Sequence, residues 1–336
     1  MLARPNLEFL IVCESGSVFL LDCQTRQHRQ VSHLDFPFNY DSETFNYLNK
    51  FRNEQSPLSI RSHGNYVCIA QTYGQTGAVL DLDDPKFKLL LHRGDYQVEH
   101  CRFPLALYSV DNDTFLIHGT DWNRLDVTNL KSAQILTERV VDYESNSNYF
   151  DYFHSSLSIS PDSKRFASNG WFWGPCDVIT VYEVDEFPSN FELANTQLAF
   201  GPVDGYNWDR PMCWIDDHRV GVAYNKQESG EHEGKFSSEI LVVDTTANQV
   251  VDSVEFDGFA MSEYGAPTGD LHYDIEKGWF ISINPIRGLL VADRSGKEIH
   301  ANPTLRYHRY AGAHRVLYGL SSDGKEIEMM ELDLLR

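Results

Sequence analysis

The feature that most constrains the fold of this chain is a short pattern that occurs seven times along it. Each occurrence has three or four mostly apolar residues, then an acidic residue, then a turn. The intervals between the acids are 59, 45, 57, 61, 49 and 38 residues, and each interval has room for four short strands with loops. A recurring unit of this size indicates a repeat architecture. The acids are Asp22, Asp81, Asp126, Glu183, Asp244, Asp293 and Glu331.

The residues around each acid predict the content of one unit. Another apolar strand precedes the acid, as in GWFISIN, and a more polar strand follows the turn, as in QVVDSVEF. A further strand, such as PLALYSV, opens most units. Four strands in this order form an antiparallel meander, which is the blade of a β-propeller. We therefore predict an all-β, seven-bladed β-propeller of four-stranded blades that spans residues 1–336 as a single domain, with six or eight blades as alternatives.

The two ends of the chain depart from the repeat. LEFLIVC resembles the second strands of other units, so we expect the first unit to lack an opening strand. The last unit is expected to stop after its third strand, at Leu332-Asp333. One option is that an N-terminal segment joins the last blade and so removes free sheet edges. The only helix that the sequence predicts is a short one over Ser42–Phe51, with Ser42 as its N-cap.

One unit resembles a known repeat. Residues Leu157–Val184 look like a WD40-type blade, because Ser160-Pro161-Asp162-Ser163-Lys164 is similar to the turn common in WD40-like and YVTN-like propellers. Ser322-Asp323-Gly324-Lys325 is a similar turn, placed between a second and a third strand. The Gly-His dipeptide of strict WD repeats is missing, and no Trp-Asp dipeptide ends a third strand. The stretch Tyr149–His154 also resembles a bacterial branch of WD40-like proteins to which no activity is assigned, so the resemblance implies a fold and no reaction.

The charge balance restricts the partners that we expect. The chain has 28 Lys and Arg against 49 Asp and Glu, a formal net charge of -21. Such a protein repels phosphate backbones and anionic membranes, so we expect no nucleic-acid partner and no membrane association, and a basic protein is favoured electrostatically. The alternative explanation of the negative charge is that it keeps the protein soluble, without any basic partner. No signal-peptide pattern and no long apolar run is present, so we expect a cytoplasmic monomer.

The loops expected at one end of the blades are long and rich in aromatic and acidic residues. Long loops on a rigid scaffold are where binding residues are usually found, and Tyr and Trp are rigid contact residues. We predict binding roles for Trp122, Tyr149, Asp151, Tyr152, His154, Trp171, Trp173, Trp208 and Asp209. The alternative is that these aromatic residues fold back as local core. Trp171, Phe172 and Trp173 alternate around a strand end, so at least one of them is expected to pack between blades.

Catalytic and metal-binding patterns are not evident. The chain has no GxSxG, P-loop, GxGxxG or HExxH pattern, and its cysteines have no zinc-ligand spacing, so we expect no cofactor and no metal. Paired carboxylates of a glycosidase type could involve Asp151, Asp209 and Asp270, but their separation is not readable from the sequence.

Two functions remain open. The favoured one is a non-enzymatic scaffold whose acidic, aromatic loop face docks a basic protein. The alternative is a propeller that binds a small ligand, or binds or hydrolyses a carbohydrate, in its central funnel. Enzymatic activity is therefore left uncertain, although the scaffold is preferred.

Overall fold

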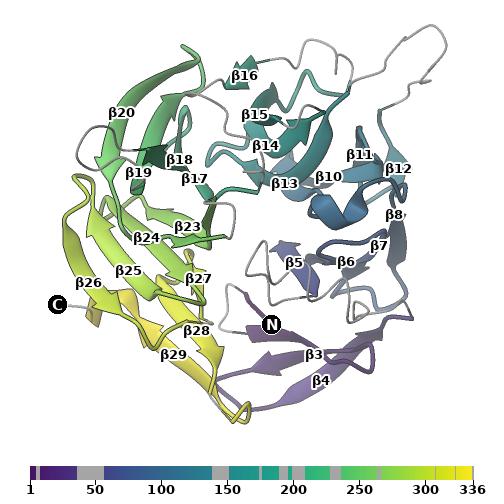
Figure 1. The fold of residues 1–336 in the computed structure, drawn as a ribbon. Helices are drawn as coiled ribbons and strands as arrows, with labels where there is room; N and C mark the ends of the chain where they lie inside the picture. Colours follow the sequence, from purple (N-terminus) through teal and green to yellow (C-terminus); the bar gives the residue numbers. More distant parts are fainter. Residues whose placement is uncertain are drawn as a thin grey trace, which may run out of the picture. The chain divides into compact units, whose positions relative to one another are not determined.

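The computed structural model describes residues 1–4, 8–35, 57–137, 151–173, 176–188, 196–198, 209–227, 236–262, 266–306, 308–321 and 323–334. In these ranges the regular structure is almost entirely antiparallel strand (Figure 1), with short 3-10 turns at η1 (Val98–His100) and η3 (Leu332–Leu334). The helix predicted over Ser42–Phe51 lies outside the described residues.

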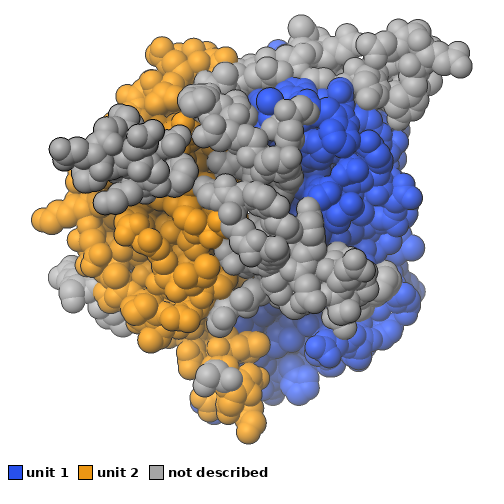
Figure 2. Space-filling model, viewed as in Figure 1, with its two compact units in different colours: residues 1–48, 54–197, 203–209 blue, residues 49–53, 198–202, 210–336 orange. Residues whose placement is uncertain are grey.

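The contacts divide the chain into two compact units (Figure 2). Unit 1 comprises residues 1–48, 54–197 and 203–209, and unit 2 comprises residues 49–53, 198–202 and 210–336. That residues 1–336 form a single domain stays a prediction.

Unit 1 contains four blades, each an antiparallel sheet of four strands. Their opening strands β5, β9 and β13 lie beside one another. The blades are β1 (Leu2–Ala3), β2 (Glu8–Val12), β3 (Ser17–Asp22) and β4 (His28–His33); β5 (Leu58–His63), β6 (Tyr66–Gln71), β7 (Thr76–Asp81) and β8 (Lys88–His92); β9 (Leu105–Val110), β10 (Asp113–Asp121), β11 (Arg124–Asn129) and β12 (Gln134–Ile135); β13 (Phe153–Ile159), β14 (Arg165–Phe172), β15 (Cys176–Glu183) and β16 (Thr196–Leu198).

Unit 2 contains three blades and a small hairpin, β21 (Ala260–Met261) with β22 (Pro267–Thr268). The blades are β17 (Met212–Trp214), β18 (Arg219–Gln227), β19 (Phe236–Asp244) and β20 (Gln249–Glu255); β23 (Asp270–Asp274), β24 (Trp279–Asn284), β25 (Gly288–Asp293) and β26 (Glu298–Asn302); β27 (Arg309–Ala311), β28 (Val316–Leu320) and β29 (Ile327–Glu331). The seven sheets follow the seven predicted units, so the predicted seven-bladed β-propeller is confirmed.

The first blade corrects one prediction about the chain ends. Its opening strand is present, because β1 pairs with β2 through Leu2 opposite Leu10 and Ala3 opposite Phe9. The N-terminal strand is therefore part of its own blade. The sequence did not reveal β1 because two residues are too short for a periodic pattern. The last blade does stop after its third strand, since the described sheet contains only β27, β28 and β29.

The apolar core lies between consecutive blades. In unit 1 a cluster that includes Leu10, Val18, Ile60 and Ile69 joins the first and second blades. In unit 2 a cluster that includes Val242 and Phe280 joins β19 to β24. Apolar residues on both faces of each sheet thus become buried only when a neighbouring blade packs against it, which explains why the strands contain nearly continuous apolar runs.

Several of the acids that end the sequence pattern cap the turns after the third strands. Asp22 accepts hydrogen bonds from the amides of Gln24 and Thr25, at 2.8 and 3.0 Å, and Asp244 and Asp293 cap their turns in the same manner. Asp126 is a correction, because it lies inside β11 and is buried. Asn129 caps that turn instead, through the amides of Lys131 and Ser132.

The two WD40-like turns share one hydrogen-bond pattern. In the first, Asp162 accepts from the hydroxyl of Ser160 at 2.7 Å and from the amide of Lys164 at 3.1 Å. In the second, Asp323 accepts from Ser321 and Lys325 at the same distances. The first turn joins β13 to β14 and the second joins β28 to β29, as the sequence predicts.

No helix in the described ranges has the length and apolar character needed to cross a bilayer. The cysteines are unpaired, and Cys68, Cys101 and Cys213 are buried, whereas Cys176 is exposed.

Candidate functional site

One loop of unit 1, Gly94–Phe103 between β8 and β9, is held by a buried arginine. Arg93 is 2% exposed, and its guanidinium lies 5.1 Å from the centre of the Phe103 ring. Because the guanidinium is planar and has five donors, one side chain fixes several carbonyls at once. Its nitrogens donate to the carbonyls of Gly74 (2.8 Å), Arg102 (3.1 Å), Val98 (3.2 Å) and Cys101 (2.7 Å).

The start of this loop lies directly against the turn between β10 and β11. A Cβ atom on Gly94 would come too close to the carboxylate of Asp121, so any larger residue would require that side chain to shift. Asp121 in turn accepts a hydrogen bond from the amide of Trp122 at 2.8 Å. The contact therefore fixes Trp122 beside the loop.

Aromatic rings from four segments of unit 1 meet around Phe153. Phe153 stacks on Trp171 with ring centres 3.9 Å apart and planes 3° from parallel. The rings of Trp122, Trp173 and Tyr96 lie 4.6, 5.7 and 5.8 Å from Phe153. The indole nitrogen of Trp171 donates to the sulfur of Cys101 at 3.1 Å, which connects the stack to the loop held by Arg93. The cluster is thus fixed from both sides.

Exposure divides this cluster into a buried base and an accessible top. Phe153 and Trp171 are 0% and 2% exposed, whereas Tyr96 and Trp173 are 46% and 52% exposed. Trp122 is half-buried and packs edge-on against Tyr96 at 5.5 Å. We call Tyr96, Trp122 and Trp173 the aromatic patch. Exposed rings on a rigid base lose little entropy when a partner covers them, which suits them to binding.

The residues beneath the patch are satisfied core residues. The hydroxyl of Tyr152 donates toward the carbonyls of Ser168 and Val178, at 2.8 and 2.7 Å, and burial raises the pKa of this hydroxyl. Gly170 leaves room for the Tyr152 ring, since a Cβ there would lie 2.7 Å from its hydroxyl. The Nδ1 atom of His154 lies 2.9 Å from the hydroxyl of Ser168. These groups position the base of the patch.

A buried carboxylate, Asp209, connects the second and fourth blades of unit 1. Its side chain is 2% exposed and accepts hydrogen bonds from the hydroxyl of Tyr73, at 3.2 Å, and from that of Ser155. The Nε atom of Arg102 lies 3.9 Å away, and the Arg102 amide donates to Ser155 at 2.7 Å. A register shift between Phe153 and Ser156 in the pairing of β13 with β14 accompanies this arrangement. Asp209 therefore ties the start of β13 to the second blade and to the loop that precedes β9.

One exposed carboxylate, Asp95, is adjacent in the chain to Tyr96 of the patch. From residue 94 to residue 123 the only Lys or Arg is Arg102, which pairs with Asp209, whereas Asp95 beside Tyr96 is exposed. The Oδ1 atom of Asp151 is buried and forms no hydrogen bond with a described residue. An exposed carboxylate and the face of an aromatic ring both attract cations.

The predicted site residues have different positions. Trp173 is exposed and Trp122 is half-buried, and both belong to the aromatic patch. Tyr152, His154, Trp171 and the Asp209 side chain are buried and act as its support. Tyr149 and Trp208 lie outside the described residues. At least one of Trp171, Phe172 and Trp173 was expected to pack inward, and Trp171 does.

Two residues of the site were not singled out from the sequence. Tyr96 lies in the loop Gly94–Arg102, whose length marked it as a binding loop, but it is one aromatic residue among many. Arg93 directly follows strand β8, and no sequence pattern distinguishes a buried arginine from an exposed one. Within the described ranges, no three His, Cys, Asp or Glu residues are grouped so that they could hold a metal ion.

Comparisons with known proteins agree with the fold. No family model and no curated protein sequence matches the chain. Among solved structures, a chain of the mitotic checkpoint complex has a TM-score of 0.59 at 11% identity, covering 98% of this chain and 87% of that one. A chain of Kuenenia stuttgartiensis hydrazine synthase has a TM-score of 0.55 at 11% identity, covering 98% and 94%. The predicted resemblance to WD40-like propellers is confirmed at the level of the fold.

Proposed function

We propose that this protein is a binding scaffold that docks a basic protein segment on the aromatic patch of unit 1. The observation that supports the proposal is the division of the cluster into two half-exposed rings, Tyr96 and Trp173, and a buried stack that holds them. Rings that are already immobilised bury area without a large ordering cost, and such residues dominate the binding energy of protein interfaces.

The charge of the surroundings determines the kind of partner that we propose. A net charge of -21 attracts cationic proteins over several ångströms, and the exposed Asp95 lies beside the patch. A lysine or arginine of the partner then finds ring faces for cation–π contact and carboxylates for ion pairing. An acidic partner would meet like charges at the same place.

The structural neighbours are compatible with a binding function, but they do not distinguish it from an enzymatic one. One neighbour is a chain of the mitotic checkpoint complex, whose name describes a protein assembly, and the other is a chain of hydrazine synthase, whose name describes an enzyme. The same fold therefore occurs in both settings, and the proposal depends on the site.

Affinity capture from the native lysate tests the proposal, with the wild-type protein and Tyr96→Ala/Trp173→Ala as baits. The matched control is Leu90→Ala/Ile135→Ala, which removes side chains that are 67% and 46% exposed elsewhere in unit 1. We expect one stoichiometric basic protein on the wild-type and control baits, reduced at least about tenfold on the patch variant, because hot-spot aromatics contribute about 2 kcal/mol or more each. Circular dichroism verifies that all three proteins are folded.

The binding should also weaken as salt increases, because screening acts on exposed charges. A partner that is acidic, or that the patch variant retains as strongly as the control does, contradicts the proposal. If no bait retains a protein, the scaffold function fails for that lysate. A sugar or small ligand that quenches Trp173 fluorescence would then favour the alternative function.

A further inference from the structure

Unit 2 contains a pocket near the turns that join first to second strands and third to fourth strands. It lies between the blade β17–β20 and the blade β23–β26, and its volume is about 240 Å³. It is lined where β17 turns into β18 and where β25 turns into β26, so short turns surround it instead of long loops. A complete ligand site usually measures about 300–1,000 Å³, so this pocket suits one compact group.

The floor of the pocket is apolar. Ile215, Val242, Val254 and Phe280 line it, and all four are buried members of the core cluster that joins these two blades. The outer strand β20 adds Val251, which is 46% exposed. An apolar group that enters the pocket therefore loses contact with water and gains contact with side chains that are already packed.

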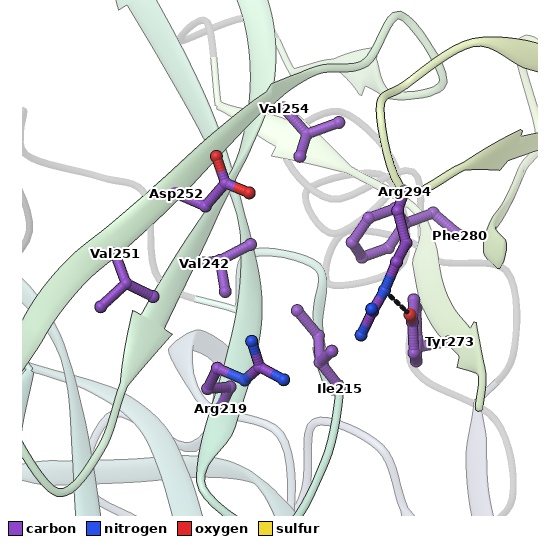
Figure 3. A pocket seen from close by; sticks show the side chains of 9 residues that line it. All are labelled: Ile215, Arg219, Val242, Val251, Asp252, Val254, Tyr273, Phe280 and Arg294. Carbon is purple, nitrogen blue, oxygen red and sulfur yellow. Dashed lines mark hydrogen bonds between the residues drawn. The ribbon is translucent and has the colours of Figure 1, made fainter. Parts of the chain in front are cut away.

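Two arginines lie at the rim of this apolar floor. In the view of Figure 3 the guanidinium groups of Arg219 and Arg294 both point toward Ile215. Arg219 is paired with Asp216, through an Nε to Oδ2 distance of 2.6 Å. The Nε atom of Arg294 donates to the hydroxyl of Tyr273 at 2.6 Å, and its terminal nitrogens form no ion pair with a described residue. Arg294 is thus an exposed cation that still has donors to offer.

The hydroxyl of Tyr273 adds a second donor beside Arg294. Since its oxygen accepts from Arg294, its own proton points elsewhere and is available to a ligand. The guanidinium carbon of Arg294 lies 5.9 Å from the centre of the Tyr273 ring, which fixes the arginine over the pocket. A planar guanidinium and a hydroxyl side by side match the two oxygens of a carboxylate.

One acid also lines the pocket. Asp252 lies on β20, and its Oδ1 atom accepts from the amide of Ser253 at 2.9 Å. Asp216 neutralises Arg219. The pocket therefore has one further cation, Arg294 in the turn after β25, and one further anion, Asp252 on β20. A ligand with a single carboxylate near Arg294 therefore fits better than a dianion, which would also meet Asp252.

We propose that this pocket binds a small monocarboxylate that has one compact apolar group, with the carboxylate on Arg294 and Tyr273 and the apolar group on Ile215 and Phe280. The site is independent of the aromatic patch, because it shares no residue with it. It gives the protein a second ligand whose chemistry is opposite to that of the basic partner.

Calorimetric titration of the full-length protein with N-acetyl-L-leucine tests this proposal. N-acetyl-L-leucinamide has the same apolar group without the carboxylate, and acetate has the carboxylate without the apolar group. We expect saturable binding of the acid, and at least about tenfold weaker binding of both controls, because each lacks one of the two contacts.

Variants then locate the binding. Arg294→Gln removes the charge and should weaken the acid at least about tenfold, whereas Arg294→Lys should retain part of the affinity. Arg287→Gln is the matched control, because Arg287 is a 45% exposed arginine of unit 2 that does not line the pocket. No saturable binding of the acid, equal binding of the amide, or an unchanged affinity in Arg294→Gln would each overturn the proposal.

Discussion

The aromatic patch of unit 1 and the pocket of unit 2 beside Arg294 differ in which groups are exposed and which are buried. In the patch the apolar rings of Tyr96 and Trp173 face solvent, and the charged groups of Arg93 and Asp209 are buried beneath them. In the pocket an exposed arginine, Arg294, lies over buried apolar residues. In the patch a long loop supplies Tyr96, whereas Trp122 lies in a short turn and Trp173 directly follows β14; short turns surround the pocket. One blade design therefore offers two surfaces of different chemistry, one at each end of its strands.

The largest expected effect is a difference in stability between substitutions of the buried Trp171 and of the exposed Trp173. Trp171→Ala removes a 2% exposed ring and should lower the free energy of unfolding by about 3–5 kcal/mol, because it leaves a cavity. Trp173→Ala removes a 52% exposed ring and should cost about 0.5 kcal/mol. Urea denaturation measures both. Similar losses in the two variants would contradict the division into base and top.

The next effect concerns the buried cation of unit 1. Arg93→Met fills the space but leaves carbonyls of Gly74 and Cys101 without their donors, so we expect a loss of about 3 kcal/mol. Hydrogen exchange should accelerate most at the amides of residues 98–103. Arg29→Met, at an exposed position, is the control and should be nearly neutral. Unchanged exchange in the Arg93 variant would show that the loop is held by other contacts.

A smaller loss in the free energy of unfolding is expected when the buried carboxylate of Asp209 is replaced by an amide. Asp209 has a φ of 64°, a backbone conformation that asparagine tolerates, so Asp209→Asn changes the charge without adding backbone strain. We expect a loss of about 1–2 kcal/mol, because Tyr73 and Ser155 donate to an amide oxygen instead of a carboxylate. Asp95→Asn, at an exposed acid of the same unit, tests whether charge alone matters. Equal losses would contradict a specific role for Asp209.

The smallest effect should be common to both units. The backbone hydrogen bond from Thr25 lowers the pKa of Asp22 in unit 1, and the hydroxyl of Ser295 lowers the pKa of Asp293 in unit 2. A folded-state pKa below the unfolded value of about 3.9 means that the unfolded state binds more protons near that pH. The stabilisation is therefore complete above that value and is lost as the pH falls through the folded pKa.

Asp22→Asn and Asp293→Asn should each reduce the slope of stability against pH below about pH 4, so that the small loss of stability at pH 7 disappears as the pH falls through the folded pKa. Thermal unfolding from pH 2.5 to 7 measures this slope. A change in slope at neutral pH, or a change in only one of the two variants, would contradict the shared role of these turn acids.

The sequence predicted the blades because their signals are local. An apolar strand followed by Asp22 or Asp293 contains its own turn cap, so strand and turn are both visible in a few residues. Asp126 shows the limit of this reasoning. It also follows an apolar residue in the same strand pattern as the capping acids, yet it lies within β11 and accepts hydrogen bonds from Thr120 and Thr137. Only pairing with the adjacent strands distinguishes the two cases.

The site was predictable as a region and less so as residues. Trp122 and Trp173 were predicted and belong to the patch, but Trp171, with the same side chain two positions earlier, is buried. Residues two apart on a strand share one face of a sheet, so periodicity does not decide which of them a neighbouring loop covers. Cys101 and the loop held by Arg93 cover Trp171, and they come from about 70 residues away in the chain.

What the sequence alone determined is therefore the repeat, the all-β class, the seven blades, the capped turns and the acidic charge, since each is present in composition or in a window of a few residues. What only the tertiary structure decided is which aromatic rings are exposed, that Arg93 and Asp209 are buried supports, and that Arg219 and Arg294 share one pocket. The physical reason is that burial and convergence depend on contacts between blades distant in sequence, and no local pattern encodes which blade faces which side chain.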